Sequence, residues 1–281
     1  MKTALITGAT SGIGLAVAKQ LAEQNWKLLL IGRTKEHCEE AASELKREFP
    51  NIDATAFTAD LSLLSEVARV AQAVNFHIET YCSGELNVLV NNAGGVRSAR
   101  TVTAEGLELQ FALNYLSGFA LAARLLPALK KANGCIISTG SDSHLFAKKL
   151  NWKNLMLQKG YNSLKAYAQS KLCVLLFSAE FNKRSQSGVK AYVVDPGLVK
   201  TGIGKKSTKG LTKLFWLIRM KGGKHPSVPA KTFLHIVNNR PNHMYLLKTN
   251  PAKQSKISKD AATAKKLFDL SEQLANVSFD F

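Results

Sequence analysis

Cysteine pairs, long apolar runs and acidic residues are all scarce in this chain of 281 residues. The four cysteines, Cys38, Cys82, Cys135 and Cys173, form no C-x-x-C pair, which excludes a sequence-readable zinc knuckle and a disulfide framework. Unpaired cysteines favour a reducing compartment, so we expect a cytoplasmic protein. The six histidines are scattered without metal-ligand spacing on one helix, and no metal site is expected.

Membrane and secretion signals are missing as well. The richest apolar stretch, Leu113–Leu129, is interrupted by Asn114, Ser117 and Arg124, which predicts a buried helix rather than a membrane span. The first ten residues, MKTALITGAT, enter a strand directly and lack the apolar core and cleavage site of a signal peptide. We therefore expect a soluble protein.

Acidic residues number 20 against 38 Lys and Arg, so the formal net charge is +18. The excess lies mostly in residues 200–281, which hold 16 basic and 4 acidic residues. Such a charge makes nucleic acid, an anionic membrane surface and an anionic cofactor candidate partners. Because no helix-turn-helix, zinc finger or aromatic-interleaved basic motif is present, no nucleic-acid partner is expected.

Short β-rich runs alternate with helical windows along the chain. Strands are predicted at Thr3–Thr7, Lys27–Ile31, Ala54–Thr58, Val88–Asn91, Cys135–Thr139, Val189–Val194 and His243–Leu247. Helices are predicted at 12–24, 35–48, 62–75, 104–131, 163–185, 226–239 and 259–275. The alternation predicts an α/β fold, a Rossmann-type doubly wound parallel sheet with helices on both faces. We expect a single domain over 1–281, with a cofactor-binding and catalytic core at 1–200 and a substrate lid and C-terminal lobe at 201–281.

A glycine-rich segment, TGATSGIG at 7–14, follows the first predicted strand and opens the first helix. Gly8, Gly12 and Gly14 remove side chains that would block a tight turn and the approach of a phosphate. Backbone N–H groups at a helix N-terminus suit a pyrophosphate. A lone glycine motif is weak, and a plain strand–turn–helix is the alternative. The position at the first strand–helix turn favours the nucleotide-binding interpretation.

Polar residues and glycines also follow the other predicted strands. They are Gly32-Arg33, Asp60-Leu61, Asn91–Gly94, Gly140-Ser141 and Asp195-Pro196-Gly197. Open α/β sheets bind ligands outside the carboxyl ends of their strands, so these residues are expected to converge on one crevice. Arg33 stands where an acid would accept from a ribose hydroxyl, and a guanidinium there favours the 2′-phosphate of NADP over NAD.

Tyr167 and Lys171 are four residues apart on a predicted helix, which puts both side chains on one face. A free phenol is a poor proton donor or acceptor at neutral pH, and a nearby ammonium favours the phenolate and lowers the phenol pKa. Ser141 can donate a hydrogen bond to a substrate carbonyl oxygen. Tyr and Lys at this spacing are common on amphipathic helices, so the pair alone is weak evidence.

Taken together, TGATSGIG, Asp60, NNAG at 91–94, Asn114, Ser141, Tyr167-x-x-x-Lys171 and Pro196-Gly197 resemble the short-chain dehydrogenase/reductase family, in family order, over about the first 200 residues. The segments AYAQSKLCVLLFSAEF, DPGLVKT and AKKLFDLSEQL, and the basic insert from His144 to Lys165, are similar to its retinol dehydrogenase-like branch. Asn87 and Ser117 depart from common family residues, away from the chemistry. Many enzymes of that branch carry a membrane segment before the first strand, whereas this sequence starts at the strand. The resemblance alone therefore does not support a retinoid substrate.

The resemblance implies a role for each motif. Tyr167 is the expected general acid or base, Lys171 holds the nicotinamide ribose and lowers the Tyr pKa, Ser141 positions the carbonyl, and Asn114 holds a relay water. The residues expected along NADP(H) are Gly8, Ser11, Gly12, Ile13, Gly14, Arg33, Asp60, Leu61, Asn91, Ala93, Gly94, Tyr167, Lys171, Pro196, Gly197, Val199 and Thr201.

The segment from about Gly202 to Lys224 is expected to be the substrate lid. Its apolar patch from Leu214 to Ile218 lies among lysines, so it either covers a hydrophobic carbonyl compound and touches an anionic membrane, or packs in the core with a solvated basic face. His144 is expected to be structural. Family members are often dimers or tetramers, and the extended C-terminal lobe leaves both a homo-oligomer and a monomer open.

The sequence thus predicts an NADP(H)-dependent oxidoreductase that interconverts a hydrophobic ketone or aldehyde and its alcohol, a small-molecule substrate. The alternative is a non-catalytic NADP-binding protein that uses the fold as a redox sensor or scaffold.

Overall fold

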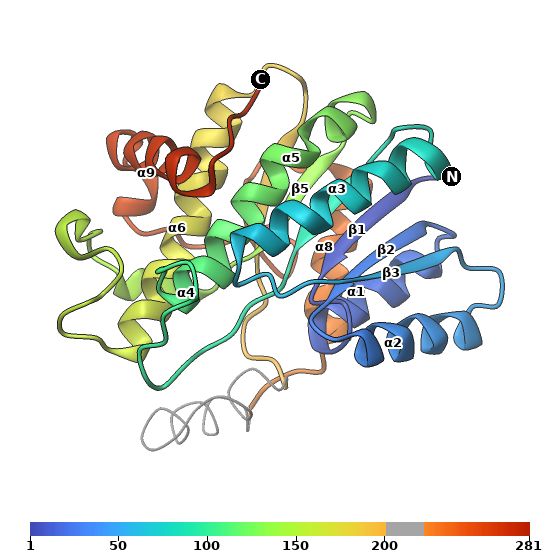
Figure 1. Cartoon of the computed structure of the whole chain (residues 1–281), viewed down its shortest axis with the longest axis horizontal. Coiled ribbons are helices and arrows are strands. Elements are labelled where there is room, and N and C mark those ends of the chain that lie inside the picture. Colours follow the sequence, from blue (N-terminus) through green and yellow to red (C-terminus); the bar gives the residue numbers. More distant parts are fainter. Residues whose placement is uncertain (201–221) are drawn as a thin grey trace.

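The computed structural model describes residues 1–200 and 222–281. The strands of the described residues form one sheet in the order β3-β2-β1-β4-β5-β6-β7-β8 (Figure 1). Their bounds are β1 Thr3–Thr7, β2 Lys27–Gly32, β3 Ala54–Thr58, β4 Val88–Asn91, β5 Cys135–Thr139, β6 Lys190–Asp195, β7 Tyr245–Leu247 and β8 Asn250–Pro251. All neighbouring pairs are parallel except β7 with β8. The predicted Rossmann-type sheet is confirmed, and the strand order reverses between β1 and β4, where such sheets bind ligands.

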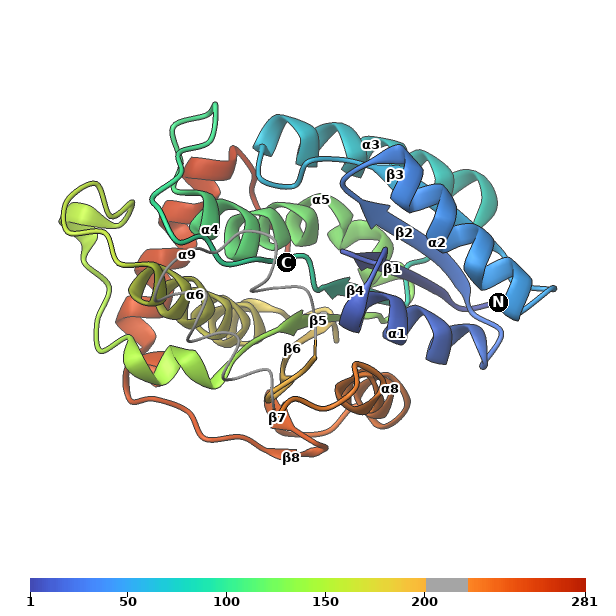
Figure 2. The same ribbon diagram turned by 90° about the horizontal axis from the view of Figure 1, so that it is seen from below.

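Helices cover both faces of the sheet (Figure 2). The apolar cluster on one face joins the sheet to α1 Gly12–Ala22, α2 Lys35–Glu48 and α8 Ser227–Asn239. The cluster on the other face joins it to α3 Leu64–Tyr81, α5 Ser117–Lys131, α6 Ser163–Arg184 and α9 Ala261–Ala275. A sheet covered on both faces requires strands that are apolar throughout, and all five residues of β1 are buried.

The helix predicted over 104–131 is wrong at its start. Residues 104–106 form a turn in which Gly106 has a φ of +81°. Helix α4 begins only at Leu109, because the Glu108 carboxylate caps it by accepting from Phe111 N at 2.8 Å. Helix α3 extends to Tyr81, beyond the predicted end at 75, and the short strand β8 was not predicted.

Among the described residues, the helical stretch Leu109–Lys131 is the one long and apolar enough to cross a membrane. Its apolar window is 78% buried inside the protein, as the sequence predicted for the Leu113–Leu129 run. It therefore has the burial of a core helix.

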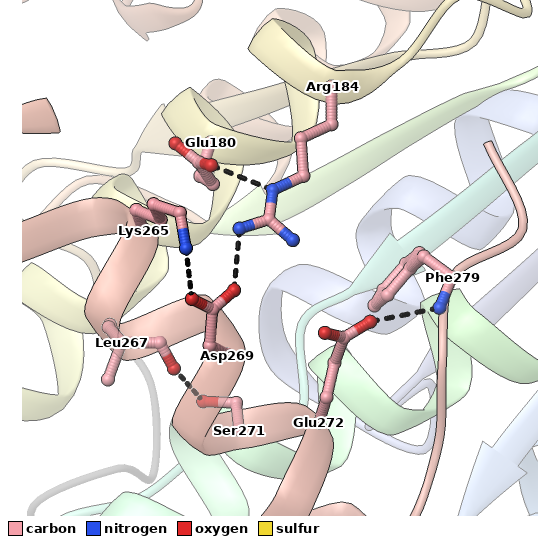
Figure 3. Close-up of polar contacts among 8 residues, drawn as sticks. All are labelled: Glu180, Arg184, Lys265, Leu267, Asp269, Ser271, Glu272 and Phe279. Carbon is pink, nitrogen blue, oxygen red and sulfur yellow. Dashed lines mark hydrogen bonds and ion pairs between the residues drawn. The ribbon is translucent and has the colours of Figure 1, made fainter. Parts of the chain in front are cut away.

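The C-terminal helix α9 is joined to α6 by ion pairs, which Figure 3 shows, and by contacts between aromatic rings. Arg184 at the end of α6 donates to Glu180 and Asp269, each at 2.7 Å, and its guanidinium lies 4.2 Å from the Phe268 ring centroid. The Phe279 backbone N–H donates to the Glu272 carboxylate of α9 at 3.0 Å, so the last residues of the chain are bound to that helix. The last segment of the chain is thus part of the packed structure.

Candidate active site

Two glycines of the turn after β1 occupy positions where a side chain would be strained or would collide with the backbone. Gly8 has a φ of +62°, and a Cβ there would lie 3.0 Å from Ala93 Cα. A Cβ on Gly14 would collide with the carbonyl oxygen of Gly8, which is backbone and cannot rotate away. These glycines let the β1–α1 turn lie against the segment after β4, at the point where the strand order reverses.

The N-terminus of α1 is open to an anion. Its N-cap residue, Ser11, is exposed and makes no side-chain capping bond, and the first turn holds no acid. The first N–H groups of a helix have no partner within the helix, and the helix dipole favours negative charge there. The turn from β1 into α1 holds the residues predicted along the pyrophosphate, Gly8, Ser11, Gly12 and Gly14, together with the predicted cofactor residue Ile13.

Two residues that the sequence prediction did not include, Thr7 and Asn92, fasten β1 to the segment after β4. The Thr7 hydroxyl accepts from Asn92 N and Ala93 N, each at 2.9 Å, and Asn92 Nδ2 donates to Thr7 O at 3.1 Å. Asn91 directs its amide to Gly118 O of α5 at 3.2 Å. Asn92 lies inside the NNAG motif, which was the signal in the sequence that could have identified it. Its side chain joins β1 to the segment after β4, where the strand order of the sheet reverses.

Arg33, Asp60 and Leu61 follow the ends of β2 and β3. Arg33 is exposed, and within residues 1–200 and 222–281 no carboxylate pairs with it. Asp60 accepts from the Ser62 N–H at 3.0 Å and from the Ser62 hydroxyl at 2.7 Å, and Leu61 is buried in the core. Arg33 is therefore the group of the three that is free to meet an anion.

Asn114 lies in a π-helical turn, Ala112–Leu116, that interrupts the helix between α4 and α5. Its Nδ2 donates to Gly95 O and to the Ser170 hydroxyl, each at 3.0 Å, and its Oδ1 accepts from Gly95 N at 2.8 Å. π-Helical turns are frequent at functional sites. This one fixes the segment after β4 to the middle of α6.

Tyr167 and Lys171 are both buried on α6, with Lys171 Nζ 5.6 Å from the centroid of the Tyr167 ring. The ammonium donates to Thr139 O at the end of β5, at 2.8 Å. Burial lowers the pKa of Lys171 to about 8, and the negative charge of Asp195 opposes the shift. The ring of Tyr167 packs against Val96.

Ser141 follows β5 and begins a short 3₁₀ turn, Asp142–Phe146, that packs against α6. Its hydroxyl lies 3.2 Å from Asp142 Oδ1 and 3.1 Å from Ser143 Oγ. His144, behind it, is fully buried with both ring nitrogens engaged, by Ser141 O at 2.7 Å and by Ser255 N at 3.3 Å. The structural role predicted for His144 agrees with these contacts.

The turn after β6 is held by its own first residue. Asp195 Oδ1 accepts from Gly197 N at 2.9 Å, and Gly197 has a φ of +64°. Val199 is buried and forms an isolated parallel bridge with Lys224. Thr201 and most of the predicted lid, Gly202 to Lys224, lie outside the described residues.

The structure therefore brings Asn114, Ser141, Tyr167 and Lys171 to the carboxyl edge of β4, β5 and β6. Ser170 next to Lys171 binds Asn114, and Lys171 binds the last residue of β5, immediately before the Ser141 turn. The arrangement offers a phenol, an ammonium and a hydroxyl in one place, beside a helix N-terminus suited to phosphate.

Comparison with curated proteins gives relatives of moderate identity. Retinol dehydrogenase 13 of Homo sapiens is 34% identical over 231 residues, 77% of this chain and 67% of that protein. Retinol dehydrogenase 12 of Mus musculus is 35% identical over 236 residues, 83% of this chain and 72% of that protein. Polyprenol dehydrogenase of Homo sapiens is 31% identical over 227 residues, 78% of this chain and 65% of that protein.

Solved structures share the fold. An uncharacterized protein from Mycobacterium Paratuberculosis has a TM-score of 0.78 at 26% identity, covering 100% of this chain and 96% of that one. A short-chain dehydrogenase from Sphingobium yanoikuyae in complex with NADPH has a TM-score of 0.69 at 24% identity, covering 97% and 94%. A short chain dehydrogenase/reductase from Burkholderia phymatum in complex with NAD has a TM-score of 0.68 at 22% identity, covering 88% of each chain.

A family model described as short chain dehydrogenase matches residues 2–212, well over half of the chain. The sheet order, the glycine turn and the relatives all agree with this match. The chain belongs to the short-chain dehydrogenase/reductase family, and within it to the retinol dehydrogenase-like branch.

Proposed function

We propose that this protein is an NADP(H)-dependent oxidoreductase that interconverts a hydrophobic ketone or aldehyde and its alcohol, working in the reductive direction in cells. The observation that carries the proposal is the pairing of Tyr167 with Lys171 on α6, where the ammonium lies 5.6 Å from the phenol ring centroid. The Ser141 turn packs against the same helix. A dinucleotide-binding protein without chemistry would not need this group of side chains.

The residues present fit a dinucleotide. A side chain would be strained at Gly8 and would collide with the backbone at Gly14, and the first turn of α1 has no acid and no side-chain cap. A phosphate would accept from the N–H groups of that turn, with Arg33 at the end of β2 available for the 2′-phosphate. Asp60 and Leu61 would flank the adenine, and Asn91, Ala93 and Gly94 would line the cofactor. The residues near the nicotinamide would be Pro196, Gly197, Val199 and Thr201.

In the proposed mechanism the four side chains have different tasks. NADPH, when bound, would supply the hydride. Tyr167 would give its phenolic proton to the carbonyl oxygen, or take it back in alcohol oxidation. Lys171, a buried cation, favours the phenolate that remains and holds the ribose hydroxyls. Ser141 donates a hydrogen bond to the oxygen as negative charge develops. Asn114 fixes the segment at Gly95 to α6. It also binds the water through which the proton on Tyr167 is replaced.

Two observations support the finer parts of the proposal. Arg33 is an exposed guanidinium without a carboxylate partner in the described chain, which favours NADP over NAD. Relatives named for retinol and polyprenol, long apolar alcohols, are 31% to 35% identical to this chain, which favours a hydrophobic substrate. The single-domain division at 200, the lid, its membrane contact, the oligomeric state and the cytoplasmic location stay predictions.

The test is NADPH consumption across a panel of aliphatic and aromatic aldehydes and ketones, with Tyr167→Phe as the variant. We expect the variant to lose about 10²- to 10⁴-fold in kcat, the usual contribution of a positioned acid–base group, while the NADPH Kd stays within about twofold. Tyr81→Phe is the matched control because that phenol is 60% exposed at the end of α3. Undiminished turnover by Tyr167→Phe contradicts the mechanism. A wild-type protein that binds NADPH but reduces nothing in the panel favours the redox sensor or scaffold instead.

A further inference from the structure

Tyr245, on β7, reaches the active site from a part of the chain that carries no family motif. Its hydroxyl donates to Asp195 Oδ2 at 2.8 Å, and the other oxygen of that carboxylate accepts from Gly197 N at 2.9 Å. Asp195 is 6% exposed, so its buried carboxylate depends on protein donors. Tyr245 therefore holds the residue that shapes the Pro196–Gly197 turn.

The ring of Tyr245 also lies against residues that precede and follow Ser141 in the chain. Before Ser141, a Cβ on Gly140 would lie 3.2 Å from Tyr245 Cε2. After it, the ring of His144 meets the Tyr245 ring at 5.4 Å between centroids and 86° between planes, an edge contact. One side chain thus contacts both the turn after β5 and, through Asp195, the turn after β6.

His144 links the Tyr245 ring to Ser141, and its hydrogen bonds determine which of its ring nitrogens carries the proton. Its Nε2 accepts from the Ser255 backbone N–H at 3.3 Å, so the proton lies on Nδ1, which donates to Ser141 O at 2.7 Å. Burial lowers the pKa of His144, which favours the neutral ring, and the two hydrogen bonds select this tautomer. Ser255 belongs to the segment after β8, so this C-terminal segment holds the His144 ring, and the ring in turn holds the Ser141 carbonyl.

We infer that Tyr245 and His144 are positioning residues, by which the C-terminal segment holds the Ser141 hydroxyl and the Pro196–Gly197 turn in the geometry needed for hydride transfer. The inference rests on the proposed function, since it assigns these residues to that same site. Neither side chain touches the reacting atoms. They act through Ser141 and through Asp195.

Tyr192 offers a matched comparison within the same sheet. It lies on β6, is 2% exposed like the 1% of Tyr245, and its hydroxyl has no hydrogen-bond partner in the described structure. Removing the Tyr192 hydroxyl therefore deletes a buried oxygen that binds nothing, whereas removing that of Tyr245 leaves a buried carboxylate short of a donor.

The experiment compares Tyr245→Phe with Tyr192→Phe in the full-length protein. We expect Tyr245→Phe to lower kcat/KM for the carbonyl substrate about tenfold and to weaken NADPH binding at least threefold, measured by quenching of tryptophan fluorescence. Tyr192→Phe is expected to match the wild type in both. Circular dichroism and thermal unfolding verify that both variants are folded at the assay temperature.

A second pair of variants tests His144. His144→Asn keeps an amide donor near the position of Nδ1, and His144→Leu removes it. If the ring positions Ser141, His144→Leu lowers kcat at least tenfold with the NADPH Kd within twofold, and His144→Asn restores most of the loss.

Kinetics and NADPH binding of Tyr245→Phe equal to those of Tyr192→Phe would overturn the inference, as would equal kcat values for the two His144 variants. Either result leaves the proposed function standing as long as the wild type turns over and Tyr167→Phe does not. Conversely, loss of NADPH affinity in Tyr245→Phe supports the inference without any turnover measurement.

Discussion

Lys171 is a buried ammonium, and its replacement by methionine is expected to stabilise the protein while abolishing activity. Burial lowers the pKa of Lys171 from 10.5 to about 8. At about 1.4 kcal/mol per pKa unit, this shift corresponds to about 3 kcal/mol against the charged form in the folded chain. Loss of the hydrogen bond to Thr139 O offsets about 1 kcal/mol. The expected net gain in the free energy of unfolding of Lys171→Met at pH 7 is therefore about 2 kcal/mol.

The pH dependence distinguishes this cause from simple improvement in packing. Below pH 8 the lysine is protonated in both the folded and the unfolded chain, so the folded wild type carries the full cost of the buried charge. Between about pH 8 and 10.5 the folded chain has lost the proton and the unfolded chain has not, so the stability attributable to this group rises with pH. The advantage of the variant should shrink by about 1.4 kcal/mol per pH unit in that window.

Urea unfolding of the cofactor-free protein, followed by circular dichroism at pH 7, 8, 9 and 10, measures the difference. Lys165→Met is the control, because that lysine is exposed on the same helix and should give a difference near zero at every pH. A Lys171→Met variant no more stable than the wild type at pH 7 would refute the reasoning. A stability gap that stays constant from pH 7 to 10 would refute it too, because packing alone has no such dependence.

Two further substitutions test the cofactor site. Arg33→Asp should raise the NADPH Kd at least tenfold and leave the NADH Kd within about threefold, since a charge-assisted bond to phosphate contributes about 1.5–3 kcal/mol. Arg47→Asp on α2 is the control. Parallel changes in both dissociation constants, or a similar effect from the control, would show that the Arg33 guanidinium does not select the 2′-phosphate. Gly14→Ala should lower the free energy of unfolding by more than 2 kcal/mol and weaken NADPH binding, because its Cβ would meet Gly8 O and lie 2.7 Å from Asn92 Nδ2. Gly222→Ala, whose Cβ would meet nothing within 4 Å among residues 1–200 and 222–281, should be neutral in a urea titration.

The sheet was predictable because its pattern is local. Strands buried on both faces give apolar runs bounded by turn residues, and the ranges Thr3–Thr7, Ala54–Thr58, Val88–Asn91 and Cys135–Thr139 match the observed strands. The Tyr167–Lys171 pair was predictable for the same reason, since a spacing of four on a helix fixes a shared face. The remaining residues of the candidate site were predicted because their motifs occur along the chain in the same order as in the family.

Contacts between distant segments were not predictable in this way. Tyr245 and Asp195 are 50 residues apart, and Ser255 and His144 are 111 apart, with no period that links them. The start of the helix at Leu109 was missed because the Glu108 cap competes with an apolar pattern that continues backward to Leu107. Asp195 was noted at the end of its strand, yet its role depends on the partner that β7 brings to it.

Helix α6 explains why the C-terminal segment matters to a site built from the first 200 residues. Its first half carries Tyr167 and Lys171, and its last turn is tied by Arg184 to Asp269 of α9 (Figure 3). Its N-terminus is capped by Asn162, which accepts from Lys165 N at 3.0 Å. A helix held at both ends keeps its middle residues in place, and the catalytic geometry requires placement within about half an ångström. β7 pairs with β6, α8 packs on α1 on one face of the sheet, and α9 packs on the other, so residues 227–275 contribute to both faces of the core. Substitutions there should therefore act on turnover as well as on stability.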